Sequence, residues 1–486
     1  MKITYKIIFS GLICLALIMV SSISMVVFAQ QQDTSEISIE GIWQGELKVP
    51  GIELRIVFKI SKKPDGTLTA VMDSPDQGVT GIAVEKVIVK DNTLYMEINS
   101  VGGIFEGKIS NDFLTIEGQW KQSGQSLPLT VKRVNTAIEI LRPQEPKKPY
   151  PYLEEEVIYE NKAVGIKLAG TLTLPSEQDS FPAVLLITGS GPQDRNEAIA
   201  GHRPFLVLAD YLTRQGIAVL RVDDRGVGRS TGDFSKATSE DFASDVLAGI
   251  EYLKTRKEIN PKKIGLIGHS EGGIIAPMVA VKSPDVAFIV LMAGTGLTGE
   301  EISYLQGALI AKAMGVSEEV IVKNRQFNEK IFSILKEEED SEIAEKILRQ
   351  MFMADWEKMN EEEKKVIGDP KIYLKVQLQS LLSPWFRFFL TYDPKTTLGK
   401  VKCPVLAING EKDLQVPPQE NLSIIKEALQ AGGNQNFTIM ELPGLNHLFQ
   451  TAQTGLPAEY AKIEETISPV ALKIISDWIL QQTKDK

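Results

Sequence analysis

The chain has 486 residues, 43% of them hydrophobic and 24% charged, which is the composition of a soluble globular protein. A chain of this length exceeds one ordinary domain, so we expect at least two hydrophobic cores. Its formal net charge of −10 argues against a nucleic-acid-binding protein, because such proteins present a basic surface.

The N-terminal segment has the pattern of a signal peptide. Lys2 and Lys6 precede a run without charged residues that ends at Asp33, and Val27-Phe28-Ala29 offers the small residues that a signal peptidase reads. We therefore expect residues 1–29 to be removed and the protein to be exported to the periplasm or the extracellular space. The uncharged run is also long enough to span a bilayer, so an uncleaved membrane anchor is the alternative.

Cysteine usage follows from the same segment. Cleavage after Ala29 would remove Cys14 and leave Cys403 as the only cysteine. This pattern excludes an intrachain disulfide in the exported protein and offers no cysteine-based metal site.

Residues 38–134 are expected to form an all-β domain. Short alternating runs separated by turn residues predict strands at Ile42–Val49, Ile52–Ile60, Thr67–Met72, Val84–Val89, Leu94–Ile98, Ile104–Ile109, Leu114–Trp120 and Leu127–Val131. This pattern is typical of an antiparallel meander, closed as a barrel or folded as a sandwich. Trp43 and Trp120 could stack on a sugar, but tryptophan in a small β-domain is more often part of the core. The proline-rich segment 135–152 is expected to be a stiff polar linker.

Residues 153–486 alternate strand and helix patterns. After a hairpin at Glu156–Tyr159 and Ile166–Leu174, buried strands are predicted at Ala183–Ile187, Ile217–Val222, from Lys263, Val286–Met292, Val405–Ile408 and Phe437–Glu441. Helices are predicted at Pro204–Arg214, Asp241–Lys254 and about Glu464–Leu480. Such alternation indicates an α/β fold with a mostly parallel sheet and helices on both faces.

A helical insertion interrupts this rhythm at about 298–398. Its length and charge predict a helical cap over the sheet, with acidic runs such as Glu337–Asp340 on solvated helix faces. Phe386 and Phe389 lie in an aromatic segment that could line an acyl pocket, although packing of the cap against the sheet is at least as good an interpretation.

The segment Gly268-His269-Ser270-Glu271-Gly272 matches the G-x-S-x-G nucleophile elbow, in which a serine sits on a sharp turn between a strand and a helix. A buried apolar run precedes it and a small-residue helix follows it, as that motif requires. Ser230 lies in a second match, Gly228–Gly232, but a polar loop follows it. We therefore expect Ser270 to be the nucleophile; the alternative is that Ser270 only caps a helix.

The chain has three histidines from which the general base can be chosen. His447 follows the last predicted strand, where a side chain can reach over the carboxyl edge of the sheet, and it is the expected base. His269 precedes Ser270 on a strand and should point to the other face, where it would support the elbow or contact substrate. His202, in a loop before a helix, could contact substrate, but a position at the surface is the default expectation.

The base needs an acidic partner to fix its tautomer. Asp413, directly after the strand Val405–Ile408, is the best candidate, and Glu411 is its nearest rival. The order Ser270, Asp413, His447 is the chain order of the α/β-hydrolase triad.

An oxyanion hole requires two N–H donors. We expect them from the backbone of Glu271, at the start of the helix after the nucleophile, and of Ser190, in the turn after the strand Ala183–Ile187. Gly189 and Gly191 would allow close approach of substrate, whereas Pro192 has no N–H. The alternative is that this segment is merely a flexible turn.

Together these motifs resemble an α/β-hydrolase of the bacterial esterase branch related to dienelactone hydrolases and prolyl-oligopeptidase-type serine hydrolases. The resemblance is carried by Gly189–Asn196, Asp223–Ser230, Gly268–Gly273, Gly410–Asp413 and Asn446-His447. It implies that the Asp223–Ser230 loop is structural. Because the His-Gly-Gly oxyanion motif of many lipases is missing, a long-chain lipase is not expected.

We therefore expect an exported serine carboxylesterase that cleaves short- to medium-chain acyl esters through an acyl-enzyme, without a metal or organic cofactor. Two alternatives stay open: a serine peptidase or amidase of prolyl-oligopeptidase type, and a cell-envelope binding protein whose hydrolase fold is inert. The expected partner is a small ester substrate and not a nucleic acid. The β-domain or an uncleaved anchor could add association with the cell envelope, and the sequence leaves the oligomeric state open.

Overall fold

The computed structural model describes residues 38–484 except 50–51, 78, 123–124, 137–140, 176–179, 362–363 and 365–368. The expected signal peptide lies outside these residues. The described chain forms two compact units, one containing residues 38–141 and 355–374 and the other containing residues 142–354 and 375–484. Within the described residues, no helix combines the length and the apolar character needed to cross a membrane.

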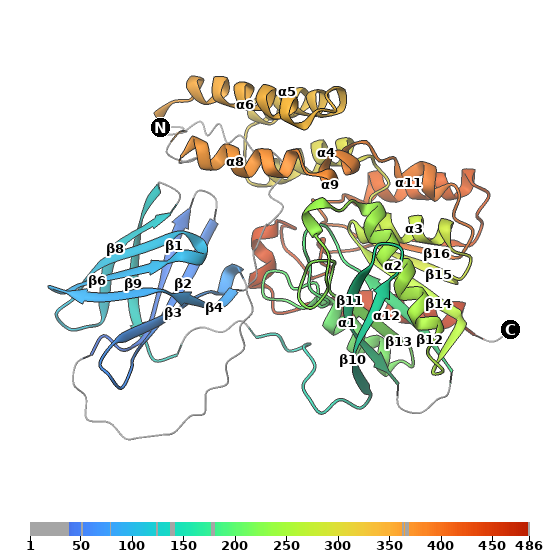
Figure 1. Ribbon diagram of the computed structural model, residues 1–486, viewed down its shortest axis with the longest axis horizontal. Helices are drawn as coiled ribbons and strands as arrows, with labels where there is room; N and C mark the ends of the chain where they lie inside the picture. The colour runs from blue at the N-terminus through green and yellow to red at the C-terminus, as the bar shows by residue number, and fades with distance from the viewer. Residues whose placement is uncertain are drawn as a thin grey trace. The chain divides into compact units, whose positions relative to one another are not determined.

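The N-terminal unit contains an antiparallel sheet (blue in Figure 1) that nearly closes into a barrel. Its strands are β1 (Gly41–Val49), β2 (Ile52–Lys62), β3 (Leu68–Ser74), β4 (Val79–Val84), β5 (Lys86–Lys90), β6 (Thr93–Ile98), β7 (Gly103–Ile109), β8 (Thr115–Gln122) and β9 (Gln125–Val134). They follow the order β4-β3-β2-β1-β9-β8-β7-β6-β5. At the two edges of the sheet, β4 lies against β6 and β5 lies against β3. The structure therefore favours the barrel over the sandwich.

Large side chains fill the inside of this unit. Trp43 is completely buried and Trp120 nearly so, and the rings of Phe58 and Phe105 meet at 5.3 Å. Both tryptophans are thus core residues. The strand β4 was not predicted. Val84 was expected to begin the next strand, but it ends β4, and β5 begins at Lys86.

The second unit is built on an eight-stranded sheet in the order β10-β11-β13-β12-β14-β15-β16-β17. Its strands are β10 (Leu153–Asn161), β11 (Ile166–Leu174), β12 (Phe181–Ile187), β13 (Ala218–Val222), β14 (Ile259–His269), β15 (Phe288–Met292), β16 (Val405–Gly410) and β17 (Phe437–Leu442). The pairs β10–β11 and β11–β13 are antiparallel, and all later pairs are parallel. This is the α/β-hydrolase fold, as the sequence predicted.

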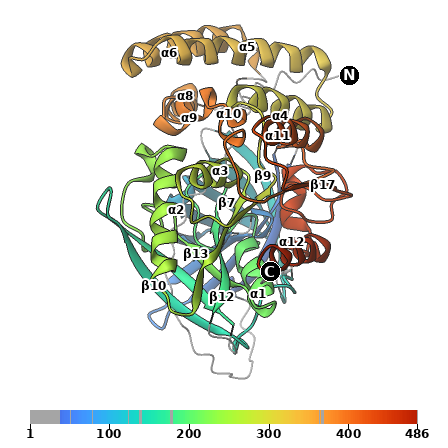
Figure 2. The same ribbon diagram turned by 90° about the vertical axis from the view of Figure 1, so that its right-hand side faces the viewer.

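Helices cover both faces of this sheet (Figure 2). One face carries α1 (Pro204–Arg214) and α12 (Pro469–Gln482); the other carries α2 (Ser239–Lys254), α3 (Gly272–Lys282) and α11 (Pro418–Ala431). Along β12, Ala183, Leu185 and Ile187 face α2 and α3, while Val184 and Leu186 face α1. Both faces are apolar, which explains why the central strands read as continuous hydrophobic runs.

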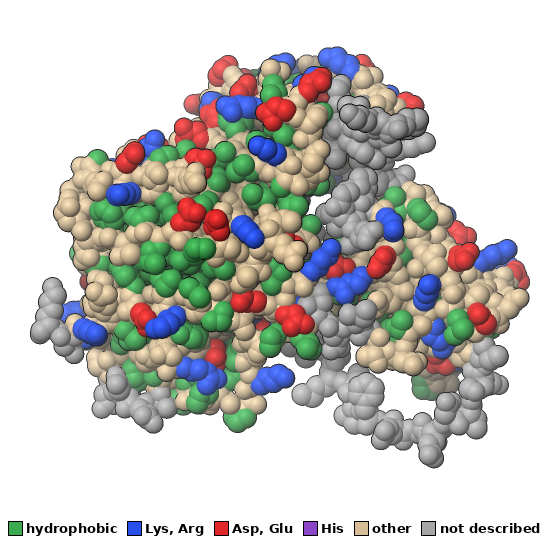
Figure 3. All heavy atoms as spheres, turned by 180° about the vertical axis from the view of Figure 1, so that it is seen from behind, with side chains coloured by type: hydrophobic (Ala, Val, Ile, Leu, Met, Phe, Trp, Pro, Cys, Tyr) green, Lys and Arg blue, Asp and Glu red, His purple; other side chains and the backbone are tan. Residues whose placement is uncertain are grey.

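The expected helical cap is present between β15 and β16. It consists of α4 (Gly299–Ala313), α5 (Glu318–Glu337), α6 (Ser341–Lys358), α8 (Pro370–Leu381), α9 (Pro384–Thr391) and α10 (Pro394–Leu398). Acidic and basic side chains are interspersed over its surface in Figure 3. Several of them pair one helical turn apart, as Lys323 does with Glu319 and Arg349 with Glu345. The charged faces of these helices are therefore solvated, whereas Glu338–Asp340 of the expected acidic run lie in the turn after α5.

Candidate active site

Four loops that carry the predicted site residues leave the sheet at the same edge. They follow β12, β14, β16 and β17, which run parallel, so their carboxyl ends meet. The chain order also reverses on either side of β12, and open α/β sheets bind ligands at such a switch point. The fold thus brings segments that are up to about 260 residues apart in sequence to one place.

Ser270 occupies a strained turn between β14 and α3. Its φ angle is 52°, in the left-handed region that serine rarely adopts, and its N–H donates to Met292 O at 2.9 Å. The flanking glycines make this turn possible, because a Cβ on Gly268 would collide with Gly272 O and one on Gly272 would collide with Ile187 O. The half-buried Ser270 therefore has the backbone geometry of a nucleophile elbow.

His447 and Asp413 form a buried pair. His447 Nδ1 lies 2.8 Å from Asp413 Oδ2, while Asp413 Oδ1 accepts the N–H groups of Gln415 and Val416, each at 2.8 Å. The rival Glu411 is exposed and accepts the Gly444 N–H at 2.7 Å. The partner of His447 is thus Asp413. Among the described residues, no hydrogen bond joins His447 to the hydroxyl of Ser270. Proton transfer between these two side chains is therefore part of the proposed mechanism and not an observed contact.

The turn after β12 is held by carboxylates. Gly189 N–H donates to Glu197 Oε1 at 2.7 Å, and Asp224 accepts from Thr188 Oγ1 and from Gln193 N–H, both at 2.9 Å. Burial, reinforced by the charges of Glu271 and Glu197, raises the pKa of Asp224 well above its ordinary value. This turn is therefore fixed by specific contacts, which argues against a merely flexible segment.

Two N–H groups beside this turn are left free. Within the described part of the chain, neither Ser190 N–H nor Glu271 N–H has a hydrogen-bond acceptor, whereas Gly189 N–H is used by Glu197. Gly189 also lies against the nucleophile, since a Cβ built on it would be 3.2 Å from Ser270 Cβ. The two expected donors are thus the ones that remain available for an oxyanion.

A cavity of about 40 Å³ opens beside Gly189 and Glu271, and neither Ser190 nor Ser270 is among its lining residues. Gly189, Gly191 and Glu271 line its polar side, and Phe242, Val246 and other apolar residues of α2 and the sheet line the rest. A buried water needs roughly 10–15 Å³ of such space, so this cavity has room for only a few non-hydrogen atoms.

The side chain of Glu271 links the elbow to the cap. Its Oε1 accepts from Ser239 Oγ at 2.6 Å and from Trp385 Nε1 of α9 at 2.8 Å, and burial raises its pKa. Trp385 stacks on Phe389, with ring centroids 5.2 Å apart. Trp385 belongs to the same aromatic segment as Phe386 and Phe389, and its contact with Glu271 was not predicted.

Phe386 has a different environment from the expected acyl pocket. It is 1% exposed and packs against Phe332 of α5, with ring centroids 5.8 Å apart. The structure therefore places it in the interior of the cap, packed against another cap helix and not in an acyl pocket. Phe389 is half-buried and lies beside Trp385.

His269 and His202 are both buried. His269 uses Nδ1 for Glu197 Oε1 (2.9 Å) and Nε2 for His447 O (3.0 Å), which leaves no ring nitrogen for a substrate. The expectation that His202 lies at the surface is wrong. It is 1% exposed, because Tyr460 O and Thr466 Oγ1, more than 250 residues later in the chain, each lie 2.9 Å from its ring nitrogens.

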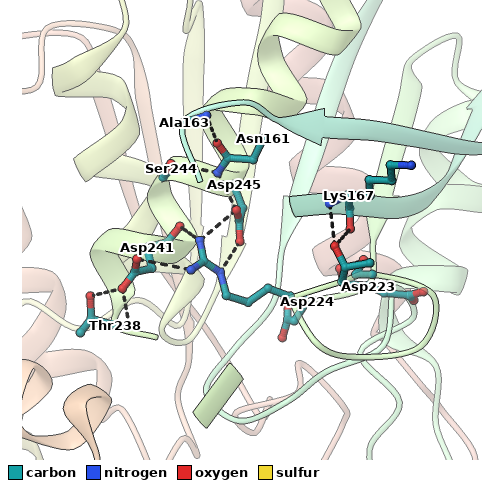
Figure 4. Close-up of polar contacts among 12 residues, drawn as sticks. Asn161, Ala163, Lys167, Asp223, Asp224, Thr238, Asp241, Ser244 and Asp245 are labelled. Carbon is teal, nitrogen blue, oxygen red and sulfur yellow. Dashed lines mark hydrogen bonds and ion pairs between the residues drawn. The ribbon is translucent and has the colours of Figure 1, made fainter. Parts of the chain in front are cut away.

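The Asp223–Ser230 loop is fastened to its surroundings (Figure 4). Arg225 donates from Nε to Asp245 Oδ2 at 2.7 Å, and Asn161 donates to Asp245 Oδ1 at 2.7 Å, which ties the loop to α2 and β10. Ser230 donates its hydroxyl to Asp223 O at 2.7 Å and accepts Ala169 N–H at 2.9 Å. These contacts give the loop and Ser230 a structural role.

Comparisons with known proteins agree with this architecture. The sequence model of the X-Pro dipeptidyl-peptidase (S15) family matches residues 134–439, which is more than half of the chain. Esterase EstD of Thermotoga maritima is 26% identical over 312 residues, covering 64% of this chain and 65% of that esterase. The chain thus spans somewhat less than two thirds of the length of this relative.

Solved structures of esterases also resemble it. Est1E from Butyrivibrio proteoclasticus, in its complex with ferulic acid, is 16% identical, with 67% of this chain and 98% of that chain covered and a TM-score of 0.39. The Pyrococcus furiosus esterase Pf2001 is 16% identical, with 68% and 90% covered and a TM-score of 0.40.

Proposed function

The chain belongs to the X-Pro dipeptidyl-peptidase (S15) family of serine hydrolases, and we propose that within this family it is a carboxylesterase for short-chain acyl esters. The observation that carries this proposal is the strained Ser270 turn beside two N–H groups without acceptors. A nucleophile placed next to unused donors is what acyl transfer requires, because charge develops on the carbonyl oxygen in the transition state.

In the proposed mechanism Ser270 Oγ attacks the ester carbonyl carbon, and its proton passes to His447 Nε2. The N–H groups of Ser190 and Glu271 hold the oxyanion, aided by the positive end of the α3 dipole. Collapse of the intermediate breaks the ester bond, and the alcohol leaves with the proton from His447. Water, deprotonated by His447, then releases the carboxylic acid. Asp413 holds the imidazole in the required tautomer throughout.

The cavity beside Gly189 and Glu271 supports a preference for short acyl groups. We expect kcat/KM for p-nitrophenyl acetate or propionate to exceed that for the octanoate by about tenfold or more, because each methylene that does not fit costs binding. Replacing Phe242 by alanine should widen the cavity and raise the octanoate-to-acetate ratio. Phe437→Ala is the matched control, since Phe437 lies on β17 outside the cavity lining. A wild-type preference for octanoate would contradict the assigned pocket.

A peptidase is the second candidate, and one observation favours it. Asp224 and Glu271 place two carboxyl groups on the cavity wall, where a substrate amine could bind. The same assay should therefore include X-Pro p-nitroanilides. We expect ester turnover to be faster; faster cleavage of the anilides would assign the protein to the peptidases instead.

We also propose that the protein is exported, with the β-domain or an uncleaved anchor able to hold it at the cell envelope. The N-terminal sequence supports this: two lysines, a long uncharged run and small residues before Gln30. The mass of the mature chain should correspond to a start at Gln30. A mature chain that retains residues 1–29 in the membrane fraction would support the anchor, and one that retains them in the cytoplasm would refute export.

A further inference from the structure

Both ring nitrogens of His269 face hydrogen-bond acceptors. Nε2 lies 3.0 Å from the backbone oxygen of His447, which can only accept, so Nε2 carries a hydrogen. Nδ1 lies 2.9 Å from Glu197 Oε1, an oxygen that also accepts the Gly189 N–H at the short distance of 2.7 Å. An imidazole that carries a hydrogen on both nitrogens would satisfy both of these acceptors.

This buried ion pair connects the three parts of the proposed site. Glu197 fixes the turn that carries Ser190, and its own φ angle of 51° shows a constrained backbone. His269 directly precedes Ser270 on β14. By its hydrogen bond to His447 O, it also holds the turn that carries the base. The ring centroids of His269 and His447 lie 4.9 Å apart. Asp413 fixes the other side of that ring.

The charges around His269 favour the protonated form. Burial opposes a charge on this ring, but Glu197, the carbonyl of His447 and the more distant Asp413 outweigh it and raise the pKa of His269. Phe449 forms an apolar wall, with ring centroids 6.5 Å apart. Near Glu197 lie two further acids, Asp224 and Glu271, whose pKa values are raised by burial. The pKa of His202 is shifted in the opposite direction to that of His269, because burial and the charge of Arg142 lower it to about 4.

We propose that His269 is a positioning residue held as an imidazolium, which clamps the oxyanion turn and the base-bearing turn to the nucleophile elbow. This role rests on the proposed esterase function, in which His447 is the base.

Histidine-selective NMR tests the protonation state without an activity assay. The full chain has three histidines, so a ¹⁵N-histidine sample gives three imidazoles, and His269→Asn identifies the signal of His269. At pH 7 we expect both nitrogens of His269 to carry hydrogen and His202 to be a neutral tautomer. A His269 with one unprotonated nitrogen at pH 7 would overturn the proposal, whatever the enzyme hydrolyses.

Kinetics of Glu197→Gln test the positioning role. This variant removes the carboxylate but keeps an acceptor oxygen, so His269 should become neutral. We expect kcat to fall about tenfold with little change in KM, because the turns that carry the oxyanion donor and the base lose the ion pair that holds them. Glu411→Gln removes an exposed carboxylate from the same sheet edge and should leave kcat at the wild-type level.

The two tests separate the possible failures. A wild-type kcat in Glu197→Gln, or a loss of kcat that only follows a lower melting temperature, would mean that Glu197 and His269 at most stabilise the fold, and it would overturn the positioning role. If the wild-type protein hydrolyses no ester at all, the proposed function fails, but the NMR result still decides the state of His269.

Discussion

Replacing Ser270 by alanine is expected to lower kcat/KM for p-nitrophenyl acetate by about 10⁴-fold or more, because the acyl-enzyme cannot form without the Oγ nucleophile. The fold should survive, since the Ser270 N–H and the glycines that shape the turn are unchanged. Initial-rate kinetics on the purified chain measure the loss, and a thermal melt checks folding. Activity that remains near the wild-type level would refute the assignment of Ser270.

Ser230→Ala is the matched control, because Ser230 lies in the second G-x-S-x-G segment of the chain. Among the described residues its hydroxyl bonds to the backbone of Asp223 and Ala169, so its loss should cost about 1–2 kcal/mol of stability and leave the chemistry intact. A fluorophosphonate probe should label the wild type and Ser230→Ala but not Ser270→Ala. Failure to label the wild type would favour the alternative of an inert hydrolase fold that binds the cell envelope.

The sheet of the second unit was predictable because its strands are local apolar runs. β12 and β15 lie between helices on both faces, so nearly every residue in them is hydrophobic, and their bounds follow from the sequence within about two residues. The β4 strand was missed for the converse reason. It is short and partly exposed, with no turn dipeptide to separate it from β5, so no local pattern marks it.

Contacts between distant segments could not be predicted in the same way. Trp385 meets Glu271 across 114 residues, and Glu197 meets His269 across 72, yet neither pair has a spacing that a motif records. His202 was misplaced because its burial depends on residues 460 and 466, which fold over it from near the C-terminus. The proposed order Ser270, Asp413, His447 could be predicted because three loosely specified residues had to agree with one topology.

The second large effect is expected from Asp413→Asn, which should lower kcat by about 10⁴-fold with little change in KM. An amide at this position would present its NH₂ group to His447 Nδ1, so the imidazole would bind in the tautomer that carries its hydrogen on Nε2. That tautomer cannot take the proton of Ser270. The backbone contacts of Oδ1 with Gln415 and Val416 can be kept by asparagine, so the fold should be preserved.

Glu411→Gln separates the two acids of this loop. Glu411 is exposed and accepts only the Gly444 N–H among the described hydrogen bonds, a contact that glutamine can also make, so kcat/KM should stay at the wild-type level. Equal losses in both variants would instead indicate damage to the loop, and a loss confined to Glu411→Gln would make Glu411 the partner of the base. Because Asp413→Asn preserves the contacts of Oδ1, inactivity in a protein that still melts like the wild type assigns the effect to the 2.8 Å contact between Oδ2 and His447.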